Sequence, residues 1–378
     1  MAGNPRLSPA RGEPAADERA VRAGVWGKCS AAVRLSRGVR VLRSLLAAVG
    51  GSTVRIQYIW AIGALALCGC GNDDETPGPA ADVTLPDPGP NGWQWTTGTF
   101  EVPQGEEIQD CYFFQVPGDK PVFVNRITLA QNEGTHHMNV FRVRTPKGLS
   151  GKHGEVVKGG ECWKSVNWSD WPLVTNSQSG GATEDWNLPD RVGLKIEPGE
   201  MLMLQTHYVN GSTQSTPTRG KVVVNFYGAE PSEIDHEMGT LFATNQNIRI
   251  CPGDNKKTFE ATCKVGQDGP VTVAAANGHF HSRGDRFTMK TWEPMGGAGA
   301  QFYESLTWDE PPFTKDLSVP IADKGGITWT CEFSALASEC GDPKDECCFT
   351  FGGKVEFQEH CNAFAYYWPK GASDKNCF

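Results

Sequence analysis

The sequence predicts an all-β protein built from antiparallel β-sandwiches. Short apolar or alternating runs recur from residue 93 onward, among them "PVFVNRITLA" (121–130), "KVVVNFYG" (221–228) and "RFTMKTWE" (286–293). Turn signals such as "VPGD" (116–119) separate these runs, and the chain has 44 glycines and 25 prolines in 378 residues. Because no long segment shows the apolar period of an α-helix, the pattern favours sandwiches of short strands.

Residues 1–70 are expected to be a leader outside the fold. The segment "VRIQYIWAIGALALCGC" (54–70) places an arginine before an apolar run (58–67) that is too short to span a bilayer. That length suits the apolar core of a secretory signal. The segment ends in "LCGC", which resembles a bacterial lipobox with Cys70 as the lipidated residue. A signal without lipid is the alternative.

A tether and two domains are expected after the leader. Residues 71–92 are acidic, rich in proline and glycine and without periodicity, so they predict a disordered tether. The stretch "AEPSEID" (229–235) interrupts the strand pattern and predicts a domain boundary. The two domains are therefore expected at 93–230 and 231–378.

The charge of the chain argues against binding to nucleic acid. Residues 1–70 hold 10 of the 35 basic and 3 of the 44 acidic residues, which leaves 25 and 41 in residues 71–378 and a net charge of −16 there. Binding to phosphates needs a basic face, which so acidic a body does not predict.

The cysteines predict disulfides and export. Ten of the 13 lie beyond the leader, an even number, and no C-x-x-C pair suggests a zinc site. The adjacent Cys347 and Cys348 are expected to pair with different partners. Together with the leader, this predicts an exported protein that is periplasmic or anchored in the outer membrane, with the lipid as its contact with the membrane.

Four of the eight histidines fall in two tight pairs within strand-like sequence. His279 and His281 are two residues apart, so a strand presents both rings on one face, where they can bind one metal ion. His136 and His137 are adjacent, so their joint use needs a strand end or a bulge. His207 lies on a strand face with Gln205. A solvent-facing pair and a buried core histidine are the plainer alternatives, and a cupin site is excluded because "SRGDR" after His281 lacks the required glutamate.

Four motifs together resemble the copper type II ascorbate-dependent monooxygenases, the family of dopamine β-monooxygenase and peptidylglycine α-hydroxylating monooxygenase. Their order and spacing match that family across residues 95–378. The motifs are "HHMNVF" (136–141), "LQTHYVN" (204–210), "NGHFHSRG" (277–284) and "EHCNAFAYYWP" (359–369).

The resemblance implies two jelly-roll-like antiparallel β-sandwich domains in tandem, each with one mononuclear copper, facing each other across a cleft. The first copper supplies electrons, and the second binds dioxygen where the C–H bond is hydroxylated. Cys331 and Cys361 are implied to form a disulfide beside the third ligand of the second copper. The implied ligands are His136, His137 and His207 for the first copper, and His279 and His281 for the second.

One departure from the family concerns the third ligand of the second copper. The family has a methionine directly before the cysteine of the last motif, where this chain has His360. An imidazole there would complete a catalytic set with His279 and His281, and would favour Cu(II) more than a thioether does. The alternative alignment uses "DECCF" (345–349), with Cys347 at the methionine position.

A second departure concerns the substrate. Members that amidate peptides have an arginine two residues before the His-x-His pair, where this chain has Asn277, and a tyrosine where it has Phe364, while Asn362 is retained. Without the arginine, a peptide carboxylate loses its charge-assisted partner. A small organic substrate is therefore expected instead of a peptide. His153 and His236 match no motif, so surface or structural roles are expected for them.

The expected activity is hydroxylation of an aliphatic or benzylic C–H bond with dioxygen and an external reductant such as ascorbate. The alternative is an exported copper-binding or electron-transfer protein on the same fold. A zinc hydrolase is disfavoured, because no carboxylate stands beside the histidines at the spacing of zinc proteases.

Overall fold

The described part of the chain is all-β, as the sequence predicts. A computed structural model describes residues 82–146, 148–149, 151–159, 170–180, 183–211, 217–296 and 298–378. These residues contain no α-helix. Short 3-10 helices occur at η2 (Pro231–Glu233), η3 (Val265–Asp268) and η4 (Pro343–Asp345).

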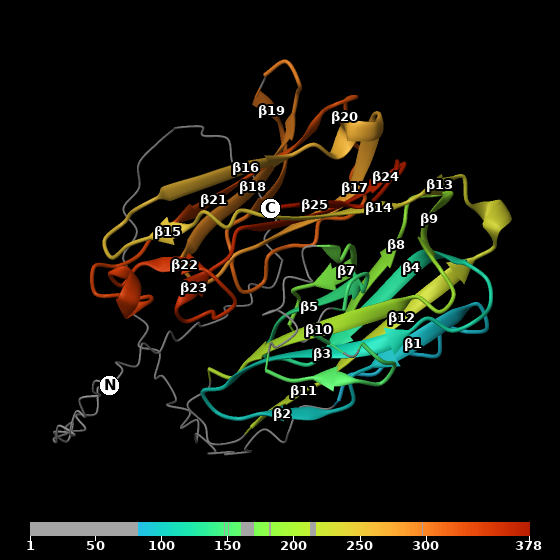
Figure 1. Cartoon of the computed structure of the whole chain (residues 1–378), viewed down its shortest axis with the longest axis horizontal. Coiled ribbons are helices and arrows are strands. Elements are labelled where there is room, and N and C mark those ends of the chain that lie inside the picture. Colours follow the sequence, from blue (N-terminus) through green and yellow to red (C-terminus); the bar gives the residue numbers. More distant parts are fainter. Residues whose placement is uncertain are drawn as a thin grey trace, which may run out of the picture. The chain divides into compact units, whose positions relative to one another are not determined.

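The first half of the described chain forms two facing sheets (Figure 1). One has the order β1-β12-β4-β9-β13, with β8 also paired to β4, and the other has the order β6-β3-β10-β5-β7. A small ribbon, β11 (Thr218–Gly220) with β2 (Phe100–Val102), completes this half. The strands of the first sheet are β1 (Gly92–Thr96), β4 (Val122–Gln131), β8 (Thr183–Asn187), β9 (Val192–Ile196), β12 (Val222–Ala229) and β13 (His236–Glu237). Those of the second are β3 (Glu107–Gln115), β5 (Thr135–Arg142), β6 (Val156–Val157), β7 (Leu173–Ser177) and β10 (Met201–Val209).

The second half repeats this architecture with different strand orders. A five-stranded sheet has the order β20-β17-β24-β14-β25, and a four-stranded sheet has the order β16-β21-β18-β19. The strands of the five-stranded sheet are β14 (Gly239–Thr244), β17 (Val271–His279), β20 (Val319–Ile321), β24 (Asn362–Trp368) and β25 (Lys375–Cys377). Those of the four-stranded sheet are β16 (Lys257–Cys263), β18 (Gly284–Trp292), β19 (Ala298–Ser305) and β21 (Gly326–Phe333). A third sheet joins β15 (Arg249–Ile250), β22 (Phe349–Phe351) and β23 (Gln358–Glu359).

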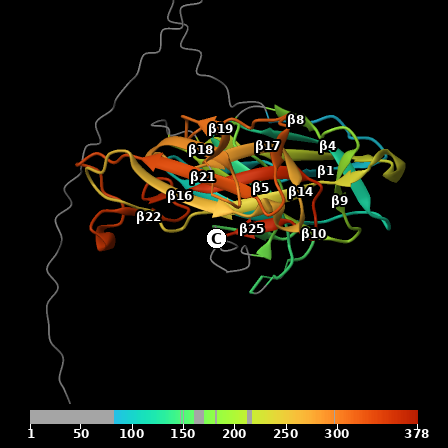
Figure 2. The ribbon, with the colours of Figure 1, turned by 90° about the horizontal axis from the view of Figure 1, so that it is seen from above.

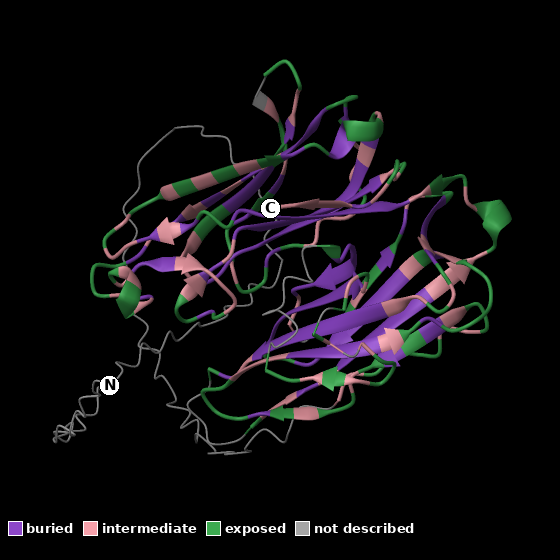
Figure 3. Ribbon diagram, viewed as in Figure 1, coloured by how far each residue is buried: buried purple, intermediate pink, exposed green. Residues whose placement is uncertain are grey.

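Strand burial follows the position of each strand in its sheet. In β1, Trp93 and Trp95 point inward between exposed neighbours and stack on Phe226 and Phe114, each at 5.1 Å. By contrast, every residue of β5 is buried. Figure 3 shows the buried residues concentrated along the strands and the exposed ones in the connecting turns. Strand β5 is therefore covered on both faces, which places its histidines in the interior.

The second face of β5 is covered by the other sandwich. Phe141 of β5 contacts Phe242 of β14 at 5.6 Å, and these two strands lie over one another in Figure 2. The hydroxyl of Tyr366 donates to Asn176 Oδ1 at 2.6 Å, and the Asn176 N–H donates back to the hydroxyl at 3.0 Å. Buried aromatic contacts and a satisfied polar pair thus join the two sandwiches. The hydrophobic core of the first sandwich extends to Phe242, Phe364 and Tyr366 of the second, which also has a core of its own.

Strand pairing changes from the first to the second sandwich just after the predicted boundary. Helix η2 lies at that boundary, β13 (His236–Glu237) still pairs with β9, and β14 (Gly239–Thr244) pairs with β24. Among the described residues, no strand up to β13 pairs with a strand from β14 onward.

Part of the expected tether lies within the described residues. Residues 82–91 have no regular secondary structure, yet they lie against the first sandwich. The Val83 N–H donates to Asn132 Oδ1 at 3.2 Å, and Asp82 pairs with Arg219 at 3.2 Å. A proline-rich segment therefore gains order from partners on the sandwich surface, which its composition does not indicate. Residues 71–81, the leader 1–70 and the expected lipidation site Cys70 lie outside the described residues.

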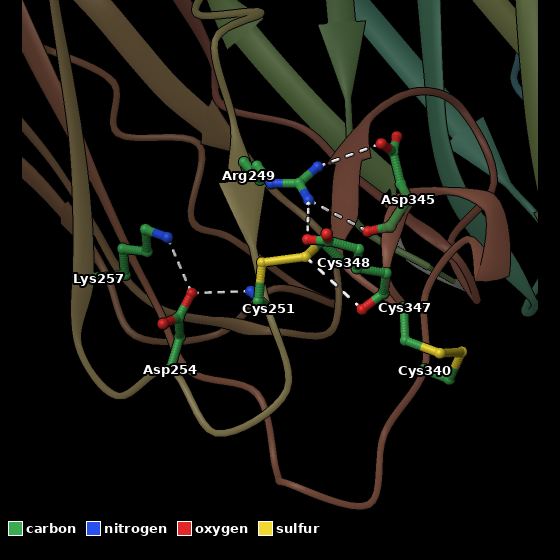
Figure 4. Close-up of a disulfide and its surroundings, with 9 residues drawn as sticks. Arg249, Cys251, Asp254, Lys257, Cys340, Asp345, Cys347 and Cys348 are labelled. Atoms are coloured by element: carbon green, nitrogen blue, oxygen red, sulfur yellow. Dashed lines mark hydrogen bonds and ion pairs between the residues drawn. A yellow bond between two sulfur atoms is a disulfide. The ribbon is translucent and has the colours of Figure 1, made fainter.

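Four disulfides join described cysteines, and they indicate an exported protein, extracellular or periplasmic. Cys331 is bonded to Cys361, as the resemblance implied, and Cys263 to Cys377. Cys347 and Cys348 have different partners, as predicted: Cys340 and Cys251 (Figure 4). In the same view, Arg249 is paired with Asp345. Arg249 also pairs with Glu346, at 2.9 Å. No helix in the described ranges has the length and apolar character needed to cross a membrane.

Removing the Cys331–Cys361 disulfide is expected to destabilise the protein. The two cysteines are 30 residues apart in the sequence, for which the constraint on the unfolded chain corresponds to about 3.6 kcal/mol. A Cys331→Ala/Cys361→Ala double variant should show this loss in urea unfolding followed by fluorescence. An unchanged unfolding midpoint would contradict the prediction.

Candidate metal centre

A β-bulge places the adjacent histidines on one side of their strand. His137 of β5 faces His207 of β10, and Thr135 faces Tyr208, so His136 is an extra residue with no partner on β10. Such a bulge turns the chain locally and redirects its side chains. The ring centroid of His207 lies 5.0 Å from that of His136 and 4.8 Å from that of His137. The three histidines expected at the first site therefore converge.

A carboxylate fixes the ring of His207, which is fully buried. Glu107 Oε1 accepts a hydrogen bond from His207 Nε2 at 2.7 Å. The proton therefore lies on Nε2, and the lone pair of Nδ1 faces His137 Nε2 at 3.1 Å. Burial acts to raise the pKa of Glu107, but the hydrogen bond and charge interaction with His207 contribute to a net lowering. Glu107 is the kind of partner that orients a metal-bound imidazole.

The second histidine set comes from the ends of two paired strands. His279 is the last residue of β17 and faces Asn362 of β24, while His360 lies two residues before that asparagine. The ring of His281 lies 5.1 Å from that of His279 and 4.5 Å from that of His360. The Cys331–Cys361 bond anchors the chain next to His360. The imidazole that replaces the family's methionine thus joins the expected ligand pair.

Protein oxygens also fix the rings of His279 and His281. His279 Nδ1 donates to Gln178 Oε1 at 2.7 Å, and the Gln178 amide nitrogen in turn donates to the carbonyl of Gly278 at 2.7 Å. His281 Nδ1 donates to the carbonyl of Gln358 at 2.9 Å. These bonds leave the Nε2 atoms of both rings as lone-pair donors for a metal.

A buried glutamate fixes the backbone that carries His281. Glu359 Oε2 accepts the N–H of His281 and Oε1 accepts the N–H of Arg283, both at 2.8 Å. Burial raises the pKa of Glu359 to about 8, against the lowering effect of these hydrogen bonds. The Glu359 carboxyl group therefore fixes the turn that follows His279. Because Glu359 directly precedes His360, it also ties that turn to the third histidine of the set.

The two sets meet in one cluster instead of standing apart across a cleft. The ring of His279 lies 4.8 Å from that of His136 and 4.7 Å from that of His137. The structure thus corrects the expectation of two separated sites: the bulge of β5 and the end of β17 lie at the same contact between the sandwiches. Two triplets have their ligand atoms within 4.8 Å of one another: His136, His137 and His279, and His279, His281 and His360.

The residues of the cluster fit a metal that binds imidazole nitrogen. Burial is the main cause that lowers the pKa of all six imidazoles, that of His281 to about 4, so their lone pairs are not protonated at neutral pH. The Nε2 atoms of His136 and His281 are buried and have no hydrogen-bond partner among the described residues. Ligands at about 2.0 Å from one ion lie at most about 4 Å apart, so small ring rotations within each triplet suffice. Imidazole suits copper, zinc, iron and nickel.

A cavity of about 280 Å³ lies beside the cluster. Its wall includes His137, His279 and His360, and the retained Asn362 and the substituted Phe364 also line it. The two strands β17 and β24 therefore present both the second histidine set and the residues expected near a substrate.

The other residues singled out in the sequence do not line the cavity. Asn277 is buried, and its Oδ1 accepts from Asn176 Nδ2 at 3.2 Å. His236 is exposed and stacks on Trp368, and His153 accepts from the Gln115 N–H at 3.0 Å, in agreement with the expected surface roles. Cys347 is disulfide-bonded, which excludes the alternative alignment that made it a metal ligand.

Sequence reasoning missed Glu107, Gln178 and Glu359. Glu359 adjoins His360 in the last motif, so its position was a usable signal. Glu107 and Gln178 lie about 100 residues from the histidines they bind, and nothing in their local sequence marks them.

Comparisons with known proteins give no family. No family model matches the chain, and no curated protein matches it. Among solved structures, the PBSX exported protein XepA is 8% identical, with 75% of this chain and 88% of that chain covered and a TM-score of 0.19. The VP2 subviral particle of infectious bursal disease virus is 11% identical, with 77% and 75% covered and a TM-score of 0.18. The tandem CBM22 domain of Paenibacillus barcinonensis Xyn10C is 10% identical, with 73% and 82% covered and a TM-score of 0.18. Similarity this low supports no conclusion about function.

Acid is expected to destabilise the metal-free protein. Histidines of the unfolded chain protonate near pH 6.5, whereas the pKa of each cluster imidazole is lowered, so the unfolded state binds more protons as the pH falls. Each imidazole that stays neutral at pH 5 costs about 2 kcal/mol. Glu359 acts in the opposite direction, since its pKa is raised, but it is a single group. Urea unfolding at pH 7.5, 6 and 5 with a chelator present measures the effect.

The matched control for this measurement is the exposed His236. A His236→Gln variant should keep the full pH dependence, and a His136→Gln variant should weaken it. Equal stability of the wild type at the three pH values would refute the prediction.

Proposed function

We propose that the protein is an exported copper-dependent monooxygenase that hydroxylates an aliphatic or benzylic C–H bond of a small organic molecule. The observation that carries this proposal is the convergence of six uncharged imidazoles beside a cavity, five of them buried and that of His360 half-buried, with the Nε2 atoms of His136 and His281 lacking partners among the described residues. The four motifs that resemble the copper type II monooxygenases contribute all six histidines. Cys70, in the leader, is proposed as the lipid anchor.

The overall reaction balances with two electrons from an external reductant such as ascorbate. One C–H bond and one O2 molecule, with two electrons and two protons, give one alcohol and one water. Copper bound by these imidazoles would supply the one-electron steps and the activation of dioxygen.

The residues of the chain would prepare this chemistry by positioning ligand atoms. Glu107 holds the Nε2 proton of His207, and Gln178 and Gln358 hold the Nδ1 protons of His279 and His281. Each ring therefore offers one defined nitrogen. As in the resemblance, His136, His137 and His207 would hold the electron-supplying copper, and His279, His281 and His360 the catalytic copper. The triplet with ligand atoms within 4.8 Å of one another joins His136 and His137 to His279 instead of His207, so the first copper needs a larger adjustment of its ligands than the second.

The second candidate is a copper-binding or electron-transfer protein without oxygen chemistry. It is favoured by His360, because a nitrogen ligand in place of sulfur changes the redox preference of the second set. Oxygen consumption that depends on ascorbate and yields a hydroxylated product distinguishes the enzyme from the carrier.

Metal analysis with EPR of the Cu(II) form tests the proposal. The wild type should bind two coppers, and His207→Ala and His281→Ala should each lose a different one. His236→Ala, which changes an exposed histidine outside the cluster, should keep both. Tight stoichiometric zinc that copper does not displace would count against the proposal.

Replacing Glu107 is expected to weaken copper binding at the first set. In Glu107→Gln the His207 ring loses its carboxylate partner, and loss of such partners lowers metal affinity about 10- to 100-fold. Competition with a chelator measures the affinity, and the EPR signal of the first site should change with it. The control is Glu106→Gln, since Glu106 is the exposed neighbour. Equal affinities in the two variants would contradict the role of Glu107.

A further inference from the structure

The cavity beside the histidine cluster lies between the two sandwiches. Gln109, Asn139 and Gln205 line it from the first sandwich, and Asn362 and Phe364 line it from the second. Its volume of about 280 Å³ is near the lower end for ligand pockets and fits a molecule of roughly ten to fifteen non-hydrogen atoms. A molecule in this space would touch imidazoles of both sets.

The wall of the cavity carries no permanent charge. Apart from three histidines, its lining consists of carboxamide side chains, phenylalanines and glycines, with no lysine, arginine, aspartate or glutamate among the described residues. In the metal-free protein, a charged ligand would lose its hydration here without gaining a counter-ion. The wall therefore selects against both carboxylates and ammonium groups.

One carboxamide in the wall has an open acceptor. Asn362 is 6% exposed, and its Oδ1 has no hydrogen-bond partner among the described residues. The neighbouring amides are engaged: Gln205 Oε1 accepts from Asn139 Nδ2 at 2.8 Å, and Gln178 bridges His279 and Gly278. A buried acceptor without a partner is unfavourable, and a ligand's N–H or O–H would supply the missing hydrogen bond.

Aromatic side chains supply the rest of the wall. Phe242 and Phe364 are stacked, with centroids 5.4 Å apart and planes 8° apart, and Phe351 also lines the cavity. Such surfaces favour an apolar or aromatic body. Asn362 faces His279 across the paired strands β17 and β24, so a ligand bonded to Asn362 lies next to the second histidine set.

We propose that the cavity binds an uncharged molecule with an apolar body and one hydrogen-bond-donating group, a primary amide or an alcohol, which pairs with Asn362. The apolar body packs on Phe242 and Phe364. That this molecule is the substrate rests on the proposed function, whereas its binding does not require turnover.

Three probes of nearly equal shape test the charge preference. Metal-free protein, kept so with a chelator, is titrated by calorimetry at pH 7.5 with 3-phenylpropanamide, 3-phenylpropanoate and 3-phenylpropylamine. The neutral amide is expected to bind at least about tenfold more tightly than either charged probe. A charged probe that binds as tightly as the amide, or no binding of the amide at 10 mM, overturns the inference.

Variants of Asn362 test the site of binding. Asn362→Asp is expected to reverse the preference, with the amine binding more tightly than the amide. Asn187→Asp makes the same change at an exposed position of β8 and should leave the preference of the wild type. If Asn362→Asp does not fold, Phe364→Leu replaces it and should weaken all three probes while keeping their order. An unchanged amide affinity in the folded variant argues against this cavity.

Product analysis separates this inference from the proposed function. Selective amide binding without any hydroxylated product, in the presence of ascorbate and oxygen, would refute the monooxygenase and leave the binding site standing. Hydroxylation of a charged probe in preference to the amide would refute the neutral site and leave the monooxygenase standing.

Discussion

The contact between the two sandwiches creates the histidine cluster, because neither sandwich alone supplies more than three of the rings. The bulged pair on β5 meets the end of β17 with ring distances of 4.8 and 4.7 Å to His279. Gln178, which follows β7, reaches across the same contact to bind His279. The aromatic contact of Phe141 with Phe242 stabilises the arrangement. Packing between the sandwiches therefore sets the distance between the two sets of ligands.

The loop from Phe351 to His360 couples the two sets. The carbonyl of Gly353 accepts from Gln109 Nε2 at 3.0 Å, and the Val355 N–H donates to Glu107, the partner of His207, at 3.4 Å. In the same loop, the backbone carbonyl of Gln358 accepts a hydrogen bond from His281 Nδ1, and the loop ends at His360. A displacement of this loop would change the surroundings of both sets together, so their geometries are not independent.

The sequence predicts the residues of the centre better than their arrangement. The spacing of His279 and His281 follows from strand geometry. The adjacent pair at 136–137 left a strand end and a bulge as alternatives, and the structure contains the bulge. The expectation that the two histidine sets are far apart was wrong, because spacing along a chain does not determine how two sandwiches pack. Glu107 and Gln178 were out of reach for the same reason: each meets its histidine through tertiary contact alone. The all-β fold was predictable, since alternation and turns are local signals.

The hydrogen-bond partners of the imidazoles differ in charge between the two histidine sets, and this difference would affect electron transfer. Glu107, whose pKa is lowered, is ionised at neutral pH and lies against His207. The oxygens bound to His279 and His281 belong to an amide and a backbone carbonyl, which are neutral. A nearby negative charge stabilises the more positive ion, so in a copper-loaded protein it favours Cu(II) at the first set. Replacing methionine by His360 favours Cu(II) at the second set, but the buried, neutral surroundings penalise the higher charge and oppose that change. In a copper-loaded protein, the carboxylate at the first set would therefore favour electron transfer from the first set to the second, the direction that the proposed hydroxylation requires.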